Sequence, residues 1–376
     1  MRTRFMRVAV PLVLLGLVAA ACGSNNDNSG ASGSSGGTGA SGASGASGAT
    51  GATCNPDFKV GLALDVGGLG DQSFNDAANR GLQQAIKDGL VCKDSVKLVP
   101  ANAAGSNLDS NIQALASAGY DYVEGVGYSF SDGVAKVAGD FPDTDFGVVD
   151  GFASTLPGGK GAPNVADFSF AANENSYLVG IAAAMQAKKD GSETVGFLGG
   201  QTIPLIQTFQ AGYQAGVASV DPQMKILVEY IGDTTQAFIN PTAGKALSEK
   251  MYSEGADVIY HVAGLSGSGL FQAAAEKKLY AIGVDSDQYL TASAAEQPYI
   301  ITSALKRVDT ATYNTIKAVA EGTFQSGFQT FNLANDGVGF ATSNPTLLTS
   351  DMVDAMEAAQ KKIVDGAIVV PASLES

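Results

Sequence analysis

Residues 58–75, FKVGLALDVGGLGDQSFN, decide the fold. The apolar run 58–64 has the length and composition of a buried strand, and an acid followed by a glycine pair ends it. A helix is expected directly afterwards, over 74–89, because Asp71 or Ser73 can cap its first turn. A strand, a glycine turn and a helix in this order predict an α/β fold with a parallel sheet.

The same alternation continues through the rest of the chain. Short apolar runs predict further strands at 96–100, 121–125, 145–149, 194–198, 225–230, 257–261, 280–284 and 299–304. Amphipathic segments predict helices at 107–118, 131–139, 173–188, 206–219, 242–254, 267–276, 309–322 and 352–362. A second series of alternating helices and strands begins after the fourth strand. This predicts two doubly wound parallel-sheet lobes joined by a hinge. We expect the first lobe to comprise 54–165 plus about 285–325, and the second 166–284 plus about 326–376.

The N-terminus has the pattern of an export signal. Within residues 1–21, three arginines precede an apolar run that is too short to predict a membrane-spanning helix. Small residues just before Cys22 resemble a bacterial lipobox, although Ala19 stands where leucine is usual. The pattern predicts a signal peptide over 1–21 and a diacylated Cys22. The alternative is an ordinary secretory signal with a chance cysteine.

A segment of low complexity follows the predicted lipid anchor. Residues 22–53 consist almost entirely of Gly, Ser, Ala, Thr and Asn, which favours a flexible linker over a packed structure. We therefore expect a folded domain tethered to the extracytoplasmic face of the cell membrane. The formal net charge of −15 argues against nucleic acid as a partner, since nucleic-acid binding requires a basic surface.

Two further cysteines, Cys54 and Cys92, each precede a predicted strand by a few residues. If these two strands are adjacent and parallel, both cysteines lie at the same edge of the sheet. A disulfide between them is then feasible outside the cytoplasm. The alternative is two free thiols.

The sequence argues against an enzyme. Its one histidine, His261, follows the apolar residues 258–260, and no G-x-S-x-G motif occurs at the end of a predicted strand. Neither a C-x-x-C pair nor a histidine cluster is present, so we expect no metal and no cofactor. The glycine-rich stretch 264–269 lacks the lysine of a phosphate-binding loop, but its backbone N–H groups can still donate to a ligand hydroxyl.

Polar and glycine-rich residues instead follow many of the predicted strands, where open α/β sheets bind ligands. The densest group precedes the first helix, whose opening turn would carry Phe74 and Asn75. A phenyl ring at this place can stack on a flat ligand, and a carboxamide offers both a donor and an acceptor to a base edge. The alternative for Phe74 is packing against its own helix.

Several stretches in order make the chain resemble a known family. They are 65–75, 195–200, 209–217, 255–257, 263–269, 282–288 and 302–309. This order resembles the basic membrane protein family of substrate-binding lipoproteins, also called the purine nucleoside receptor family. The resemblance implies a type I periplasmic-binding clamshell that captures a nucleoside for an ABC permease and catalyses nothing.

The resemblance also implies a set of ligand contacts. One stacking face would be Phe74 and the second Phe238, although 233–240 departs from the family's shorter pattern at this place. The remaining contacts would be Asp65, Asn75 and Asp150, with Asp285, Lys306 and the loop glycine Gly267 on the ribose. Buried Asp285 and Lys306 would neutralise each other, and the alternative for this pair is an ion pair that braces the hinge.

Three other functions remain open at this level. The same fold could serve another small polar ligand, such as a sugar or a signalling furanone. It could also serve a sensor that signals to a membrane receptor. A nucleoside hydrolase would need a metal-binding carboxylate cluster, which the sequence does not suggest.

Overall fold

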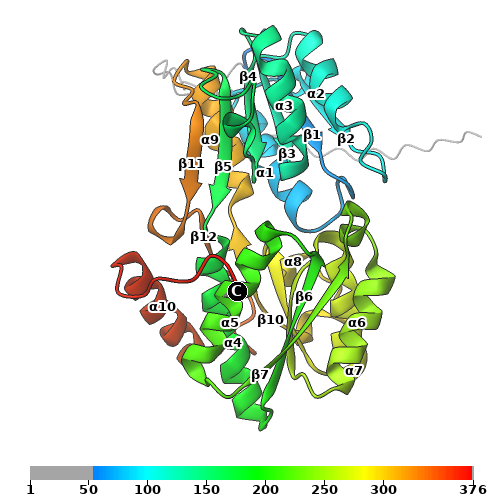
Figure 1. Cartoon of the computed structure of the whole chain (residues 1–376), viewed down its shortest axis with the longest axis vertical. Coiled ribbons are helices and arrows are strands. Elements are labelled where there is room, and N and C mark those ends of the chain that lie inside the picture. Colours follow the sequence, from blue (N-terminus) through cyan, green and yellow to red (C-terminus); the bar gives the residue numbers. More distant parts are fainter. Residues whose placement is uncertain (1–53, 375–376) are drawn as a thin grey trace, which may run out of the picture. The chain divides into compact units, whose positions relative to one another are not determined.

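The computed structural model describes residues 54–374. The expected signal peptide, the lipidated Cys22 and the linker up to residue 53 lie outside the described residues. The described part contains two six-stranded sheets, each the centre of one lobe (Figure 1). This arrangement confirms the predicted fold class of two doubly wound α/β lobes.

The sheet of the first lobe has the strand order β11-β5-β4-β3-β1-β2, and all of its strands are parallel. Its strands are β1 (Val60–Leu64), β2 (Val96–Pro100), β3 (Tyr122–Val126), β4 (Asp145–Val149), β5 (Val165–Phe170) and β11 (Gly327–Phe331). Helices cover both faces: α1 (Phe74–Lys87) and α9 (Val308–Ala320) lie on one, and α2 (Leu108–Ser117) and α3 (Ser131–Val137) on the other. Because both faces are covered, strands such as β1 are buried along their whole length.

The sheet of the second lobe has the order β12-β10-β9-β8-β6-β7. Its strands are β6 (Thr194–Gln201), β7 (Lys225–Gly232), β8 (Val258–Val262), β9 (Tyr280–Asp285), β10 (Ile300–Lys306) and the antiparallel β12 (Val338–Phe340). The helices α4 (Ala172–Asp190), α5 (Pro204–Val220) and α10 (Ser350–Val364) lie on one face. The other face carries α6 (Pro241–Ser253), α7 (Ser268–Lys277) and the short α8 (Gln288–Thr291).

The chain crosses between the lobes three times, and all three crossings differ from the expectation. The sequence placed residues from 166 onward in the second lobe, but β5 continues to Phe170 and pairs with β4 in the first sheet. The sequence placed 285–325 in the first lobe, but β10 pairs with β9 in the second sheet, so the second crossing follows Lys306. The sequence placed 326–376 in the second lobe, but β11 pairs with β5 in the first sheet. The first lobe is therefore about 54–170 plus 308–331. Local patterns missed this because β11 and β5 meet only through a long-range pairing.

Two glycines bring the helices α4 and α5 into close contact. A Cβ atom at Gly212 would lie 2.1 Å from the carbonyl oxygen of Asn173, and one at Gly216 would lie 2.1 Å from that of Tyr177. Any side chain at either position would therefore force the two helix backbones apart. This close packing matters for function, because the first turns of α5 reach the pocket described below.

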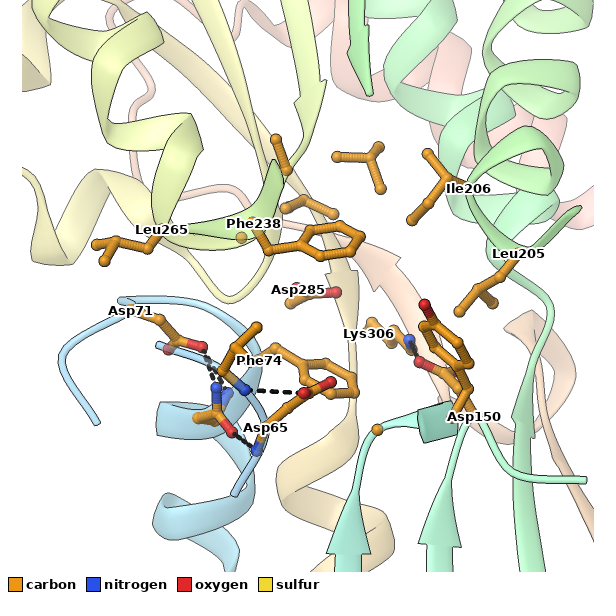
Figure 2. Close-up of a pocket in the computed structure, with 18 of the residues that line it drawn as sticks. Asp65, Asp71, Phe74, Asp150, Leu205, Ile206, Phe238, Leu265, Asp285 and Lys306 are labelled. Atoms are coloured by element: carbon orange, nitrogen blue, oxygen red, sulfur yellow. Dashed lines mark hydrogen bonds and ion pairs between the residues drawn. The ribbon is translucent and has the colours of Figure 1, made fainter. Parts of the chain in front are cut away.

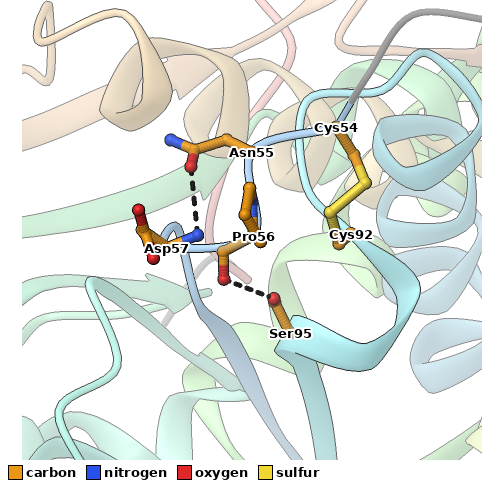
Figure 3. Close-up of a disulfide and its surroundings, with 6 residues drawn as sticks. All are labelled: Cys54, Asn55, Pro56, Asp57, Cys92 and Ser95. Carbon is orange, nitrogen blue, oxygen red and sulfur yellow. Dashed lines mark hydrogen bonds between the residues drawn. A yellow bond between two sulfur atoms is a disulfide. The ribbon is translucent and has the colours of Figure 1, made fainter.

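Cys54 and Cys92 form a disulfide across 38 residues, with their Cα atoms 5.0 Å apart (Figure 3). The expected pairing is therefore present. The cysteines precede β1 and β2, which are adjacent and parallel, so the bond lies toward the amino ends of these strands. Ser95 also donates a hydrogen bond of 2.9 Å to the carbonyl of Pro56 in the same region. These contacts fasten the first described residues to the first lobe.

Within residues 54–374, every helix is too short or too polar to cross a lipid bilayer.

Candidate ligand-binding site

A pocket lies where the carboxyl ends of the two sheets face each other. Residues of the first lobe that line it are Asp65, Val66, Asp71, Phe74, Asn75, Gly127, Tyr128 and Asp150. The second lobe contributes Leu205, Ile206, Phe209, Phe238, Val262, Ala263, Gly264, Leu265, Val284, Asp285 and Lys306. Of the eight residues that the sequence proposed as ligand contacts, seven line this pocket and Gly267 does not.

The start of α1 is capped by Asp71. Its carboxylate accepts backbone N–H groups from Ser73 at 3.0 Å, Asn75 at 2.7 Å and Asp76 at 3.1 Å. These are the donors that a helix N-terminus leaves unpaired. Of the two caps that the sequence allowed, Asp71 is the one used, because the Ser73 side chain makes no capping bond.

The side chain of Asn75 connects two pocket acids. Its Oδ1 accepts the backbone N–H of Asp65 at 2.9 Å, and its Nδ2 donates to Asp71 at 3.0 Å. The amide is 2% exposed, so its orientation is held by these two bonds. Asn75 therefore positions Asp65 and Asp71, and it keeps limited hydrogen-bonding capacity for a ligand.

The rings of Phe74 and Phe238 lie on opposite sides of the pocket (Figure 2). Phe74 comes from the first turn of α1, and Phe238 ends the 3-10 helix Thr235–Phe238. Gly200 of β6 makes room for Phe238, since a Cβ atom there would come within 2.3 Å of the ring. The alternative that Phe74 serves only as packing for its own helix does not account for its place on the pocket wall.

Lys306 forms a buried ion pair with Asp150, and their side chains are 3% and 5% exposed. The sequence expected Lys306 and Asp285 to neutralise each other. The ion pair is instead with Asp150, although the charge of Lys306 also acts on Asp285. Asp150 follows β4 of the first lobe, whereas Lys306 ends β10 of the second, so only the approach of the lobes brings them together. The ammonium also lies 4.8 Å from the ring centroid of Phe74 and 5.0 Å from that of Phe170.

Asp285 is held by a different donor, the hydroxyl of Ser73, at 2.6 Å. Burial raises the pKa of Asp285 to about 6, although the Lys306 charge and the Ser73 hydrogen bond act to lower it. Asp285 and Asp150 both have left-handed backbone conformations, with φ values of 62° and 57°. Residues other than glycine keep this strained conformation where many surrounding contacts hold them in it, as is common at binding sites.

Asp65 is a second acid of the pocket whose pKa is raised. Burial raises its pKa to about 6, and the nearby charges of Asp150 and Asp71 also act to raise it. The hydrogen bond from the Val66 N–H acts to lower it. Burial also raises the pKa of Asp71. The pocket thus combines two facing rings with carboxyl groups that can accept hydroxyl or N–H protons from a ligand.

Gly267 has a packing role that sequence reasoning mistook for a ligand contact. A Cβ atom at this position would lie 2.0 Å from Cε1 of His261, so the glycine is required by the buried imidazole. His261 Nε2 faces Gln288 Oε1 at 2.9 Å, and burial lowers the pKa of the ring to about 4. The loop glycine that does line the pocket is Gly264, at the other end of the same stretch.

Sequence reasoning also missed several residues of the pocket wall. Leu205, Ile206 and Phe209 open α5 directly after β6, and Tyr128 follows β3 by two residues. The rule that ligands bind beyond strand ends could have found Tyr128, which lies just after a predicted strand, and the first turn of the helix that follows the strand 194–198. Within residues 54–374, no three His, Cys, Asp or Glu side chains gather as metal ligands would.

Two doubly wound lobes with a pocket between their sheets define a solute-binding protein of the kind that serves ABC transporters. A solute-binding protein of an ABC transporter system from Aeropyrum pernix has a similar structure, with a TM-score of 0.71 and 29% identity over 84% of this chain and 94% of that chain. A second, from Conexibacter woesei, shares the fold with a TM-score of 0.67.

Residues 58–373 match the Bmp family of PnrA-like ABC transporter substrate-binding proteins, and the chain belongs to this family. It is 32% identical to the ABC transporter nucleoside-binding protein BmpA of Lactococcus lactis, over 84% of this chain and 89% of that protein. It is 33% identical to Basic membrane protein A of Borreliella burgdorferi, over 85% of this chain and 89% of that protein. The resemblance found in the sequence is therefore confirmed.

Proposed function

We propose that the protein captures a nucleoside, preferably a purine nucleoside, outside the cytoplasmic membrane and delivers it to an ABC importer. The observation that carries this proposal is the pair of phenyl rings, Phe74 and Phe238, on opposite sides of one pocket. Two such faces suit a planar heterocycle, since each can stack on one side of it. The nucleoside-binding name of the Lactococcus lactis relative supports the same ligand class.

The polar groups of the pocket suit the rest of a nucleoside. Asp285 and Asp65 would accept the hydroxyl protons of the ribose, and Lys306 would donate to a ribose oxygen while it stays paired with Asp150. The backbone at Gly264 takes the place proposed earlier for Gly267. Asp150 would contact either the base or the sugar through its second oxygen.

Binding would proceed by closure of the two lobes about their three crossing segments. Pocket residues come from both lobes, so the complete set of contacts exists only when the lobes are closed. The permease would then recognise the closed form.

We further propose that Cys22 is lipidated and anchors the protein to the membrane. The support is the signal-like pattern of residues 1–21 and the linker composition up to residue 53. A relative from Pyrococcus horikoshii is named an uncharacterized lipoprotein. Replacement of Cys22 by serine is expected to abolish incorporation of labelled palmitate and to release the protein from the membrane fraction.

Isothermal titration calorimetry on the chain from Cys54 onward, stripped of ligand by unfolding and refolding, tests the ligand class. Inosine, guanosine, adenosine, uridine, cytidine and ribose would be titrated separately. Tight binding of a nucleoside with no response to ribose is the expected result. Absence of binding by every nucleoside, or binding of ribose alone, would overturn the proposal and favour a sugar or another polar ligand.

A further inference from the structure

Contacts between the two lobes occur at several places around the pocket. Two of them, Ser73 with Asp285 and Lys306 with Asp150, use side chains that line or adjoin the ligand space. A third joins the hydroxyl of Tyr128, in the first lobe, to Oε1 of Gln201, in the second, at 2.8 Å. In this third contact Tyr128 lines the pocket, whereas Gln201 does not.

The direction of the Tyr128–Gln201 hydrogen bond is determined by a second bond. Gln201 Nε2 donates to the backbone carbonyl of Asp233 at 2.9 Å, within the second lobe. The amide oxygen therefore points toward Tyr128, and the phenol hydroxyl is the donor. Burial raises the pKa of Tyr128, so the hydroxyl keeps its proton across the physiological pH range.

The end of β6 connects this contact to the aromatic wall. Gln201 is the last residue of β6, and its neighbour Gly200 lies against the ring of Phe238. The same strand end therefore holds the stacking ring and the hydrogen-bond acceptor for Tyr128. A further contact between the lobes, from Gln236 to the carbonyl of Ala103, is exposed, so water competes with it. The partly buried Tyr128–Gln201 bond is shielded from that competition.

We infer that the Tyr128–Gln201 hydrogen bond is a latch between the lobes, which sets how long the closed protein retains its ligand without selecting that ligand. Tyr128 and Gln201 are positioning residues, since the bond joins protein to protein. Opening must break this bond, whereas the encounter of a ligand with the open protein does not involve it. The latch therefore acts on the dissociation rate and leaves the association rate unchanged.

The test measures inosine dissociation from the full chain in detergent, by stopped-flow displacement, and the use of inosine rests on the proposed function. Tyr128→Phe keeps the pocket ring and removes the hydroxyl, so dissociation is expected to accelerate about fivefold, the scale of one neutral hydrogen bond. Gln201→Met removes the acceptor of this bond and also the bond to the Asp233 carbonyl, so it should accelerate dissociation at least as much. The matched control is Tyr313→Phe, whose hydroxyl donates to Asp88 within the first lobe at 2.9 Å and which should leave the rate unchanged.

The double variant separates a latch from a direct ligand contact. If the Tyr128 hydroxyl acts only through Gln201, Tyr128→Phe combined with Gln201→Met dissociates no faster than Gln201→Met alone. The latch would be overturned if the increases in dissociation rate multiplied in the double variant. It would also be overturned if association became slower or if the ratio of inosine to uridine affinity changed. So would an unchanged dissociation rate in both single variants.

The latch can be tested even if the protein does not bind nucleosides. If the wild-type protein binds none of the titrated nucleosides, the nucleoside proposal fails. The latch is then tested on the compound that remains bound through purification, followed by mass spectrometry during dialysis. Faster loss from Tyr128→Phe and Gln201→Met than from Tyr313→Phe supports the latch, and equal loss overturns it.

Discussion

The hydroxyl of Ser73 donates a hydrogen bond of 2.6 Å to Oδ2 of Asp285, and this bond joins the start of α1 in the first lobe to the end of β9 in the second. Ser286 strengthens the same junction by donating to the backbone carbonyl of Ser73 at 2.8 Å. Arg80 in turn donates to Ser286 at 2.8 Å. The acid proposed to hold the ribose is thus oriented by residues of the opposite lobe.

Replacing Ser73 by alanine is expected to weaken inosine binding by about 1.5–3 kcal/mol, the scale for a hydrogen bond to a charged group. The reason is that Asp285 loses the donor that orients it. Calorimetric titration measures the change. Ser110→Ala serves as control, because its hydroxyl bonds only to the Asn107 carbonyl on the first lobe. Equal affinities for the Ser73 and Ser110 variants would contradict the prediction.

Replacing either Phe74 or Phe238 by alanine is expected to weaken nucleoside binding by about 1–3 kcal/mol, since each removes one stacking face. Both dissociation constants can be measured by calorimetry. Phe328→Ala is a suitable control because this ring is 54% exposed on β11 and does not line the pocket. A dissociation constant that stays unchanged in the Phe74 variant would count against the sandwich.

Inosine 5′-monophosphate is expected to bind at least about 100-fold more weakly than inosine, because a buried charge without a partner costs several kcal/mol. Among the described residues that line the pocket, Lys306 is the single cation, and Asp150 already neutralises it. The N-terminus of α1, which could otherwise hold a phosphate, is occupied by Asp71. Competition titrations compare the two compounds, and comparable affinities would refute this account of the pocket charge.

Glu124 is expected to make folding stability depend on pH. It is completely buried in β3 and accepts hydrogen bonds of 2.6 Å from Tyr122 and Thr312. Burial raises its pKa from 4.5 to about 7, although these two bonds act to lower it. Between these two pKa values the folded protein therefore keeps a proton on Glu124 that the unfolded chain releases. The contribution of this carboxyl to stability is complete below about pH 4.5 and is lost as the pH rises to about 7.

Glu124→Gln is accordingly expected to be more stable than the wild type at pH 8, by about 1–3 kcal/mol, because it carries no charge to bury. At pH 5 the difference should become small. Urea unfolding at the two pH values gives both free energies. The exposed Glu357→Gln is the control. An equal effect of Glu124→Gln at pH 5 and pH 8 would show that its carboxyl does not titrate in this range.

Gly267→Ala is expected to lower the free energy of unfolding by about 1–3 kcal/mol, the usual cost of overpacking. The added methyl group would overlap the ring of His261. Thermal unfolding measures the loss, and combination with His261→Ala should reduce it, because the overlapping ring is then absent. A Gly267→Ala variant with normal stability and reduced nucleoside affinity would instead support the ligand contact that the sequence suggested.

Short-range patterns determined much of this protein. Alternating apolar runs and amphipathic segments predicted most strands and helices, because strands and helices impose different periodicities on buried side chains. The rule that ligands bind beyond strand ends, together with the family resemblance, placed Asp65, Phe74 and Asp285 in one pocket. The strands β5, β11 and β12 were missed. β12 has only three residues, and β11 pairs with β5, which lies far from it in the sequence.

The sequence by itself therefore determined the two-lobed α/β class, the family, the candidate cysteine pair and seven of the side chains that reach the pocket. The tertiary structure alone decided which of these side chains contact one another. Lys306 pairs with Asp150, Ser73 with Asp285 and Tyr128 with Gln201, each across the two lobes. No periodicity records such pairs, because they depend on where the chain crosses between the lobes and on how the two sheets face each other.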